Sequence, residues 1–347
     1  GYSSAASDVY KRQLLDWMNV MDEHREASVA YITVIIVGLF FSIIYNVLAA
    51  NLRAIGDAYT PLIFLIISAV LNVVLDILCV KYMDMGVRGA AVATVVSQAV
   101  SAVLCFGYTW KKYAFLHFNI KDFVPKKEFL KPMLEGGLSM GLMNSLVSFG
   151  TLSLQTAINT LGTNTIVAHA ATRKLTNLYM LPFSVLGTTM ATYSGQNYGA
   201  GRYDRIRAGL KVSLGCSYIW CVIVLIASYT VCPYLIVVIT DTGISEVIDT
   251  ACLYQRFDTC FYLLVPTITI LRNSLQGMGD HITPIFSSGL ELVGKVLIAM
   301  LLTPVIGYWG IIVSEPIVWA VMVIPLIVSM VKRMKRAFVN EKIRNEK

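Results

Sequence analysis

The chain has 347 residues, a formal net charge of +7, and a composition that is 56% apolar but 14% charged. Typical soluble domains have about 25% charged residues, so this composition argues against a soluble protein and for a membrane protein. The seven Cys residues lack CxxC spacing and lie in or beside apolar blocks, which argues against a disulfide framework and against a metal site.

Long apolar blocks recur along the chain. The first, residues 29–50, contains 22 residues without Asp, Glu, Lys, Arg or His. A helix needs about 20 residues to cross a hydrocarbon core that is about 30 Å thick. We therefore predict an all-α polytopic membrane protein. Its nine candidate spans are residues 29–50, 62–82, 89–110, 134–160, 165–195, 208–239, 255–275, 284–303 and 308–331.

If successive spans alternate in direction, basic residues gather on one side of the membrane. That side holds Arg53, six Lys in loop 111–131, four basic residues in loop 202–211, Arg272 and the tail from Lys332. The other side holds Lys81, Arg88 and Arg256, with the acidic residues Asp241, Glu246 and Asp249. Because cytoplasmic loops are rich in Lys and Arg, we expect the basic side and the C-terminus to be cytoplasmic, in a plasma or inner membrane. The basic segments then need no nucleic acid to explain them.

Two segments share the same helix-end sequence. NLRAIGDAYTP (51–61) and SLQGMGDHITP (274–284) have Leu, Gly, Asp, Thr and Pro in register, at an offset of 223 residues. MGVRGAAVAT (85–94) and IGYWGIIVSE (306–315) share two Gly residues in the same order, at an offset of 221. Because the offset spans six predicted helices, an even number, both copies have the same orientation. The sequence therefore predicts a parallel repeat of two six-helix lobes.

The second copy has three predicted spans before its repeated segment, whereas the first copy has none. By the repeat, about 90 residues would precede the first copy, so we expect three plus six helices of a twelve-helix protein. The first residues, GYSSAASDVYKRQ, resemble a translated library adapter and lack the layout of a signal peptide. The predicted organisation is an artefact at 1–13, a partial first lobe at 14–110, a basic linker at 111–133, a complete second lobe at 134–331 and a basic tail at 332–347.

Five motifs in order resemble the multidrug and toxic compound extrusion (MATE) family. They are LRAIGDAYTPL, LNVVLDIL followed by GVRGAAVATVVSQ, AINTLGTNTIVAHAA, GQNYGAG and LQGMGD. The resemblance covers most of the chain from about residue 20 onward. It implies two six-helix lobes around a central cavity, and a secondary antiporter that exports amphipathic, often cationic, compounds in exchange for H⁺ or Na⁺. It implies no cofactor beyond the transported ion.

A candidate cation-coupling site lies in the partial first lobe. Asn72 and Asp76 are four residues apart and therefore share one helix face, and Thr94 on the next span could add a hydroxyl. An ionisable group within a span costs roughly 2.5–3.5 kcal/mol to insert, so we treat each one as a functional candidate. The resemblance places these three residues in the family's first-lobe cation site, which a carboxylate on the family's first helix completes. The alternatives are an Asp at the outer helix end, and interhelical hydrogen bonding by Asn72 and Thr94.

The second lobe contains Glu291, Lys295 and Glu315 within its last spans. At the repeat offsets, Lys295 overlays Asn72 and Glu315 overlays Thr94. We therefore expect Lys295 and Glu315 to form an internal ion pair, with Glu291, four residues before Lys295, competing for the same ammonium. We favour a structural role over direct coupling, because the Lys neutralises the site.

A polar stripe follows the span 134–160. Its members recur at helical spacing and are Asn144, Ser148, Thr151, Gln155 and Asn159. Lipid would not tolerate such a stripe, so it is expected to line a substrate cavity, with helix packing as the alternative.

Three further charged residues interrupt apolar blocks. Arg173 and Lys174 either contact anionic substrate groups or extend to the membrane interface, and the sequence does not decide between these. Asp258 is expected at the outer end of its span.

A membrane enzyme is the alternative from another class, but the sequence lacks HExxH, GxSxG, a P-loop and paired Asp-rich motifs. Within transporters, the alternative is a flippase for lipid-linked or polyprenyl-linked precursors, which a cavity ringed by Arg and Lys would favour. A third reading is a fragment without activity. We expect a monomer in a lipid bilayer that binds a small-molecule substrate and no nucleic acid.

Overall fold

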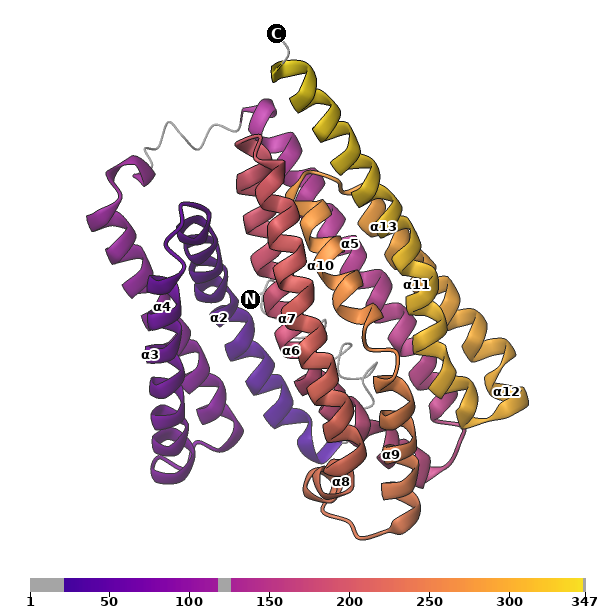
Figure 1. Ribbon diagram of the computed structural model, residues 1–347. Helices are drawn as coiled ribbons and strands as arrows, with labels where there is room; N and C mark the ends of the chain where they lie inside the picture. The colour runs from indigo at the N-terminus through magenta and orange to yellow at the C-terminus, as the bar shows by residue number, and fades with distance from the viewer. Residues whose placement is uncertain (1–21, 118–125, 346–347) are drawn as a thin grey trace. The chain divides into compact units, whose positions relative to one another are not determined.

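The computed structural model describes residues 22–117 and 126–345. Within those ranges the chain is helical and has no β-strand, which confirms the all-α prediction. The described residues form two compact units, one on each side of residues 118–125. Figure 1 draws the first unit in indigo and purple, and the second in magenta to yellow.

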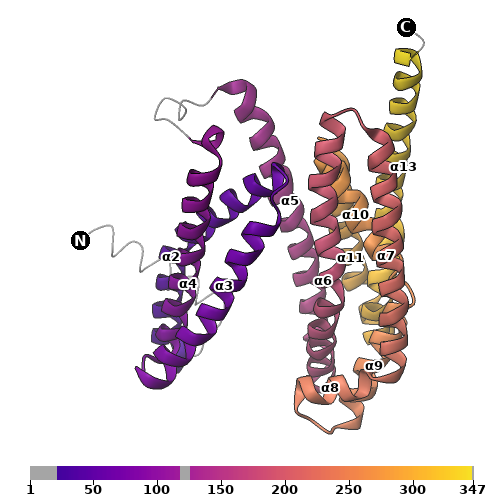
Figure 2. The same cartoon turned by 60° about the vertical axis from the view of Figure 1, so that its left-hand side comes forward.

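The first unit contains three long helices. They are α2 (Asp22–Ala54), α3 (Tyr59–Asp76) and α4 (Gly86–Lys112). A π-helical segment, η1 (Ile77–Tyr82), continues α3, and a 3₁₀ turn, η2 (Ala114–Leu116), follows α4. Helix α4 packs against both α2 and α3, as the turned view in Figure 2 shows.

The second unit contains a large core of buried apolar side chains from most of its helices, and a second, smaller buried cluster. Its elements are α5 (Lys127–Ile158), α6 (Thr163–Gly199), α7 (Tyr203–Thr230), α8 (Cys232–Thr240), α9 (Ser245–Thr259), α10 (Leu264–Gly277), α11 (Ile282–Leu301), α12 (Thr303–Ile306) and α13 (Tyr308–Asn345). Helix α5 begins within the predicted linker 111–133, and α13 continues through most of the predicted tail.

Two predicted spans of the second lobe are interrupted, which the apolar pattern did not indicate. The span 208–239 breaks at Val231 between α7 and α8, and the span 255–275 breaks at residues 260–263 between α9 and α10. A proline follows each break: Pro233 is two residues after Val231, and Pro266 is three residues after residue 263. Proline has no N–H for the carbonyl four residues earlier, and its ring clashes with that carbonyl, so a continuous helix is disfavoured at both places.

Six helical stretches of the described chain are long and apolar enough to cross a membrane. They are Val29–Ala54, Tyr59–Tyr82, Gly86–Lys112, Tyr203–Thr230, Ile282–Leu301 and Tyr308–Arg336. Helices α5 and α6 are longer than these but more polar, and the break at residues 260–263 leaves α9 and α10 short. The chain is a multi-pass membrane protein.

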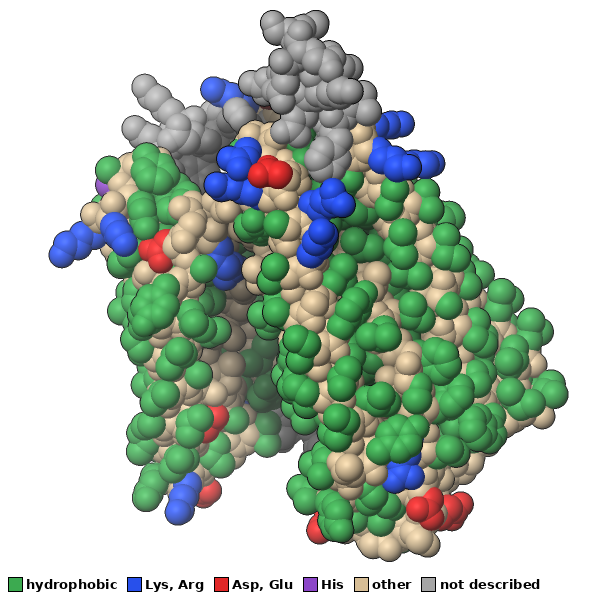
Figure 3. All heavy atoms as spheres, viewed as in Figure 1, with side chains coloured by type: hydrophobic (Ala, Val, Ile, Leu, Met, Phe, Trp, Pro, Cys, Tyr) green, Lys and Arg blue, Asp and Glu red, His purple; other side chains and the backbone are tan. Residues whose placement is uncertain are grey.

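The polarity of α7 is inverted relative to a helix of a soluble protein. Its buried positions include Ser213, Ser217 and Ser228, whereas Val222 and Ile226 are more than half exposed. Small residues let helices approach closely in a membrane, where lipid solvates the outer apolar side chains. Figure 3 shows apolar side chains over the flank of the second unit, with Lys and Arg gathered near one end.

The two copies of the repeated sequence have the same backbone conformation at their aligned glycines. Gly56 and Gly279 have φ of +95° and +77°, and Gly86 and Gly307 have φ of +53° and +59°. The glycines of each pair lie in or beside the equivalent connection between helices. Left-handed backbone is readily accessible to glycine and strained for other residues, which explains why these positions match in sequence. The matching glycine turns bear out the predicted duplication, with three long helices in the first unit.

Two aspartates of the repeat cap the helices that follow them. Asp57 Oδ1 accepts the Thr60 N–H at 3.2 Å, and Asp280 Oδ1 accepts the Thr283 N–H at 3.1 Å. Each carboxylate therefore satisfies an N–H that the first turn of a helix leaves without an intrahelical partner.

Candidate functional site

The first-lobe candidate site lies between α3 and α4. The Asn72 Nδ2 atom donates to Thr94 Oγ1 at 3.5 Å, and Thr94 Oγ1 donates to the Ala90 carbonyl at 2.9 Å. The structure thus brings Asn72 and Thr94 together across the two helices, in the interhelical bond that the sequence left open as an alternative. Their role in coupling stays a prediction.

Asp76 lies at the junction of α3 with the π-helical segment η1. Helical structure continues for six residues beyond it, so Asp76 is not the terminal residue of its span. Its Oδ1 atom is buried and has no hydrogen-bond partner among the described residues. A buried polar atom without a partner is costly, and π-helical turns are frequent at functional sites. These two features make Asp76 the strongest coupling candidate in the first unit.

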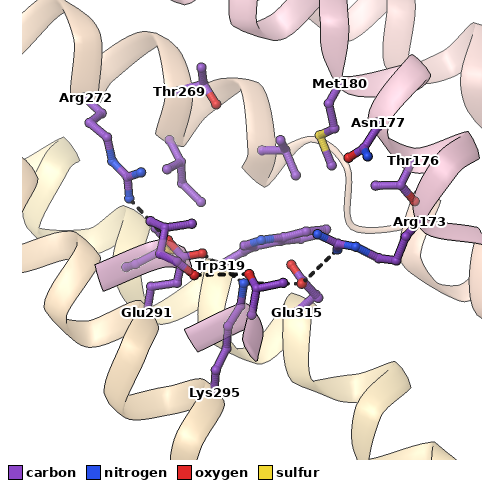
Figure 4. A pocket seen from close by; sticks show the side chains of 15 residues that line it. Arg173, Thr176, Asn177, Met180, Thr269, Arg272, Glu291, Lys295, Glu315 and Trp319 are labelled. Carbon is purple, nitrogen blue, oxygen red and sulfur yellow. Dashed lines mark hydrogen bonds and ion pairs between the residues drawn. The ribbon is translucent and has the colours of Figure 1, made fainter. Parts of the chain in front are cut away.

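Five charged side chains form an alternating row inside the second lobe (Figure 4). The row runs in the order Arg173 (α6), Glu315 (α13), Lys295 (α11), Glu291 (α11) and Arg272 (α10). We call these five residues the charged row. They join four helices that are far apart in sequence.

The distances in the charged row show how each acid is shared. Glu315 Oε1 lies 3.3 Å from both Arg173 Nη1 and Lys295 Nζ. Lys295 Nζ donates to Glu291 Oε1 at 3.0 Å, and the other oxygen of Glu291 is 3.6 Å from Arg272 Nη2. The structure therefore brings together the three residues proposed as an internal ion pair and adds an arginine at each end.

The repeat relates this row to the first-lobe site. Lys295 and Glu315 stand at the repeat positions of Asn72 and Thr94, and both pairs are in contact. At the same offset Ala299 stands in place of Asp76. The two lobes therefore use equivalent positions for different chemistry, a neutral polar pair beside an acid in the first and an ion pair in the second.

The charged row lines a cavity of about 260 Å³ within the second lobe. Thr176 and Asn177 contribute polar atoms to its wall, and Met180, Val265 and Trp319 contribute apolar surface. Polar and charged side chains outnumber apolar ones in this wall, whereas ligand pockets are lined predominantly by apolar side chains. No group of three or more His, Cys, Asp or Glu in the described part of the chain is arranged to hold a metal ion.

One member of the predicted polar stripe on α5 reaches this cavity. Thr151 lines it, whereas Gln155 donates to Asn159 Oδ1 at 2.9 Å along the helix. Asn144, Ser148 and Asn159 are exposed on the surface of the second unit. Whether these four residues line a substrate cavity remains a prediction.

The charged residues that interrupt the predicted spans differ in their exposure. Arg173 turns into the lobe and pairs with Glu315, while the neighbouring Lys174 is exposed. Arg272, which the charge pattern counted with the cytoplasmic basic residues, lies in the cavity wall with 12% of its side chain exposed. Its position inside an apolar block was the signal for a functional residue.

Asp258 was predicted at the outer end of its span, and that prediction is wrong. The side chain is buried, with 1% of its surface exposed, and its Oδ1 atom has no hydrogen-bond partner among the described residues. The helix break at residues 260–263 places the end of α9 inside the lobe, which a continuous span could not have indicated.

Comparison with known proteins gives a consistent picture. The MatE family model matches residues 4–78 and 140–301. The probable multidrug resistance protein YpnP of Bacillus subtilis is 31% identical over 176 residues, which are 51% of this chain and 39% of that protein. The multidrug export protein MepA of Staphylococcus aureus is 24% identical over 301 residues, which are 82% of this chain and 63% of that protein. The chain thus spans between 39% and 63% of the length of these two relatives.

Two solved structures share the fold. A crystal structure of MATE in the bent conformation aligns with a TM-score of 0.86 at 20% identity, over 94% of this chain and 73% of that chain. A MOP superfamily transporter from Pyrococcus furiosus, whose binding pocket is described as having reverse polarity, aligns with a TM-score of 0.86 at 22% identity, over 94% of this chain and 74% of that chain. Identities this low establish the fold alone.

Proposed function

Since the chain belongs to the MatE family, we propose that it acts as a secondary active antiporter that exports amphipathic or cationic small molecules while H⁺ or Na⁺ moves inward. The relatives named as multidrug resistance and export proteins support the transport of small molecules. The single observation that carries the coupling is Asp76, a carboxylate with a buried, unpartnered oxygen among the described residues of an apolar helix pair.

Asp76, Asn72 and Thr94 offer the ligands that such coupling needs. A carboxylate can hold a proton, or bind a hard cation together with amide and hydroxyl oxygens. Occupancy by either ion would remove the uncompensated charge from the interface of α3 and α4. The packing of these two helices would then differ between the loaded and the empty state, which is how ion binding would bias the conformation of the lobe.

Ethidium transport into inside-out vesicles tests this proposal. Vesicles from cells expressing the chain are given first a pH gradient and then a Na⁺ gradient, and dye fluorescence is followed. We expect one gradient to drive ethidium accumulation and the Asp76→Asn variant to abolish it. The effective gradient identifies the coupling ion.

A matched control is available in the same unit. Asp84 is an exposed aspartate eight residues further on, at a φ of +50° that asparagine also tolerates. Asp84→Asn should leave transport unchanged. Transport that persists in Asp76→Asn would remove Asp76 from the coupling site, and dye movement under neither gradient would count against antiport.

The finer features of the proposal concern orientation and assembly. The basic loops support a cytoplasmic location for their side of the membrane and for the C-terminal end of α13. We also propose that the chain works as a monomer in a plasma or inner membrane, without a cofactor beyond the transported ion.

A flippase for lipid-linked or polyprenyl-linked precursors is the second candidate function. The observation that favours it is the presence of Arg173, Arg272 and Lys295 in one cavity, where a diphosphate could be bound. The reverse pocket polarity described for the transporter from Pyrococcus furiosus, which suggests a different function for that protein, is a further reason to test it.

A further inference from the structure

The cavity of the second lobe has more positive charge than its own acids compensate. The charged row contains three cations and two carboxylates, and each carboxylate is shared between two of the cations. The buried Asp258 does not line the cavity and makes no ion pair with these cations among the described residues. The cavity wall therefore carries an excess of one positive charge.

Hydrogen-bond donors are in excess as well. The two guanidinium groups and the ammonium of the row carry more N–H donors than two carboxylates can accept. In Arg272 the Nη2 atom donates to Ser287 Oγ at 3.4 Å and lies 3.6 Å from Glu291, whereas the buried Nε atom has no partner among the described residues. A buried charged donor without an acceptor is costly, so an anion in the cavity would relieve that cost.

The two ends of the row are placed to reach a ligand. Arg173 is the most exposed member, with 31% of its side chain accessible, whereas the central Lys295 is 3% exposed. Figure 4 shows Arg173 and Arg272 on opposite sides of the same cavity, with Glu315, Lys295 and Glu291 between them. The planar fork of a guanidinium matches a carboxylate or a phosphate with two parallel hydrogen bonds.

We propose that this cavity binds the anionic group of the transported substrate, a carboxylate or a phosphate, between Arg173 and Arg272. Its volume of about 260 Å³ is below the ~300–1,000 Å³ of pockets that enclose drug-sized ligands, so it suits the polar head of a larger amphipathic molecule. The inference rests on the proposed transport function and adds to it a preference for amphipathic compounds that carry an anionic group.

A matched pair of dyes tests the proposal. Rhodamine 110 has a free carboxylate, and rhodamine 123 is its methyl ester with the same aromatic cation. The full chain is placed in nanodiscs of neutral phosphatidylcholine, and both Kd values are measured by fluorescence anisotropy. We expect rhodamine 110 to bind at least ten-fold more tightly. Equal Kd values, or tighter binding of rhodamine 123, would overturn the proposal.

Substitutions in the cavity wall test whether the preference for rhodamine 110 over rhodamine 123 arises in this cavity. Arg173→Gln and Arg272→Gln should each raise the Kd of rhodamine 110 at least ten-fold and change that of rhodamine 123 less than two-fold. Lys174→Gln is the matched control, because Lys174 is the exposed neighbour of Arg173 on the same helix and does not line the cavity. A preference that survives in both arginine variants would place the anion elsewhere and overturn the proposal.

Arginine-to-lysine variants keep the proposal testable if a glutamine variant does not fold. Should a glutamine variant fail to give a monodisperse protein, Arg173→Lys and Arg272→Lys keep the charge but lose the planar fork. They should raise the Kd of rhodamine 110 by a smaller factor. Unchanged binding in both lysine variants, combined with misfolded glutamine variants, would count against recognition by the guanidinium groups.

Competition distinguishes the source of the anionic group. Geranylgeranyl diphosphate that displaces rhodamine 110 at a lower concentration than benzoate or inorganic diphosphate would assign the cavity to a lipid-linked diphosphate. Displacement by benzoate in preference to both diphosphates would assign it to a carboxylate. The binding assay has no ion gradient, so failure of antiport would leave its outcome intact, and loss of the rhodamine 110 preference would leave antiport standing.

Discussion

Asp57 and Asp280 are the same residue of a duplicated lobe, and each carboxylate holds together the ends of two helices. Asp57 Oδ2 accepts hydrogen bonds from the hydroxyls of Tyr108 and Tyr113 and lies 3.7 Å from Lys112 Nζ. Asp280 Oδ2 accepts from Ser329 at 2.8 Å and from Arg333 Nε at 3.2 Å.

The repeat extends to these partners, although their side chains differ. Ser329 and Arg333 stand 221 residues after Tyr108 and Lys112, which is the offset of the paired glycines. In both lobes a hydroxyl and a cation one helical turn apart therefore contact the capping aspartate. The duplication has kept the arrangement of donors around the carboxylate and not the residues that supply them.

The capping aspartates predict how stability depends on pH. Burial raises the pKa of Asp57, but hydrogen bonds from Thr60, Tyr113 and Tyr108 outweigh it and lower the pKa to about 2. Burial likewise opposes ionisation of Asp280, while hydrogen bonds from Thr283 and Ser329 and the charge of Arg333 lower its pKa. An unfolded Asp has a pKa of about 3.9, so both carboxylates stabilise the fold above that pH, and the contribution disappears as the pH falls through the folded pKa.

Thermal unfolding in detergent between pH 7 and pH 3 measures this effect. Asp57→Asn should lower the Tm at pH 7, and the difference from the unmodified chain should shrink as the pH approaches 3. Asp241→Asn, at an exposed aspartate, serves as the control and should leave the curve unchanged. A difference in Tm that is the same at both pH values would show that the charge of Asp57 is not what stabilises the fold.

Close packing of α6 and α10 predicts that Gly277 cannot be replaced. A Cβ atom at this position would overlap the backbone of Ala191, whose carbonyl carbon would be 2.9 Å away. Backbone cannot move aside as a flexible side chain can, so Gly277→Ala should destabilise the second lobe by about 1–3 kcal/mol or more. The measurement is the midpoint of unfolding in mixed micelles, together with the yield of folded protein.

Gly289 provides the matched control for that substitution. It lies within α11, and a Cβ atom there would meet nothing within 4 Å. Gly289→Ala should be neutral or stabilising by up to about 1 kcal/mol, because alanine favours the helix. Equal effects of the two alanine variants would contradict the close approach of α6 and α10.

Lys295 lies at the centre of the charged row, and we expect the stability of the second lobe to depend strongly on it. Lys295→Gln removes the ammonium that lies between Glu291 and Glu315, and breaking a buried pair in this way costs about 3–5 kcal/mol. Adding Glu315→Gln should make the total cost smaller than the sum of the two single costs by about 0.5–3 kcal/mol. Unfolding midpoints of the two single variants and the double variant measure this coupling.

The exposed Lys174 again supplies a control, because Lys174→Gln changes the same residue type on a helix of the same lobe. Its effect on the unfolding midpoint should be small. Strict additivity of Lys295→Gln and Glu315→Gln would mean that the two side chains do not interact in the folded protein.

The sequence alone determined the class of this protein, its all-α fold and the duplication. These follow from local physics. A run of about 20 apolar residues has to be helical in lipid, and a turn with positive φ selects glycine wherever it occurs. The matching of Gly56 with Gly279, and of Gly86 with Gly307, therefore indicates positive φ at these positions from the sequence alone.

Tertiary structure decided which charges lie inside the lobes. From local sequence, Arg272 was counted with the cytoplasmic basic residues and Asp258 was placed at the outer end of its span, but Arg272 lies in the cavity wall with 12% of its side chain exposed, and Asp258 is buried. Their positions depend on where Pro266 breaks the helix and on which face of each helix meets a neighbour from a distant part of the chain. Charge burial is set by these long-range contacts, which no local pattern contains, and so the charged row became visible when four helices were brought together.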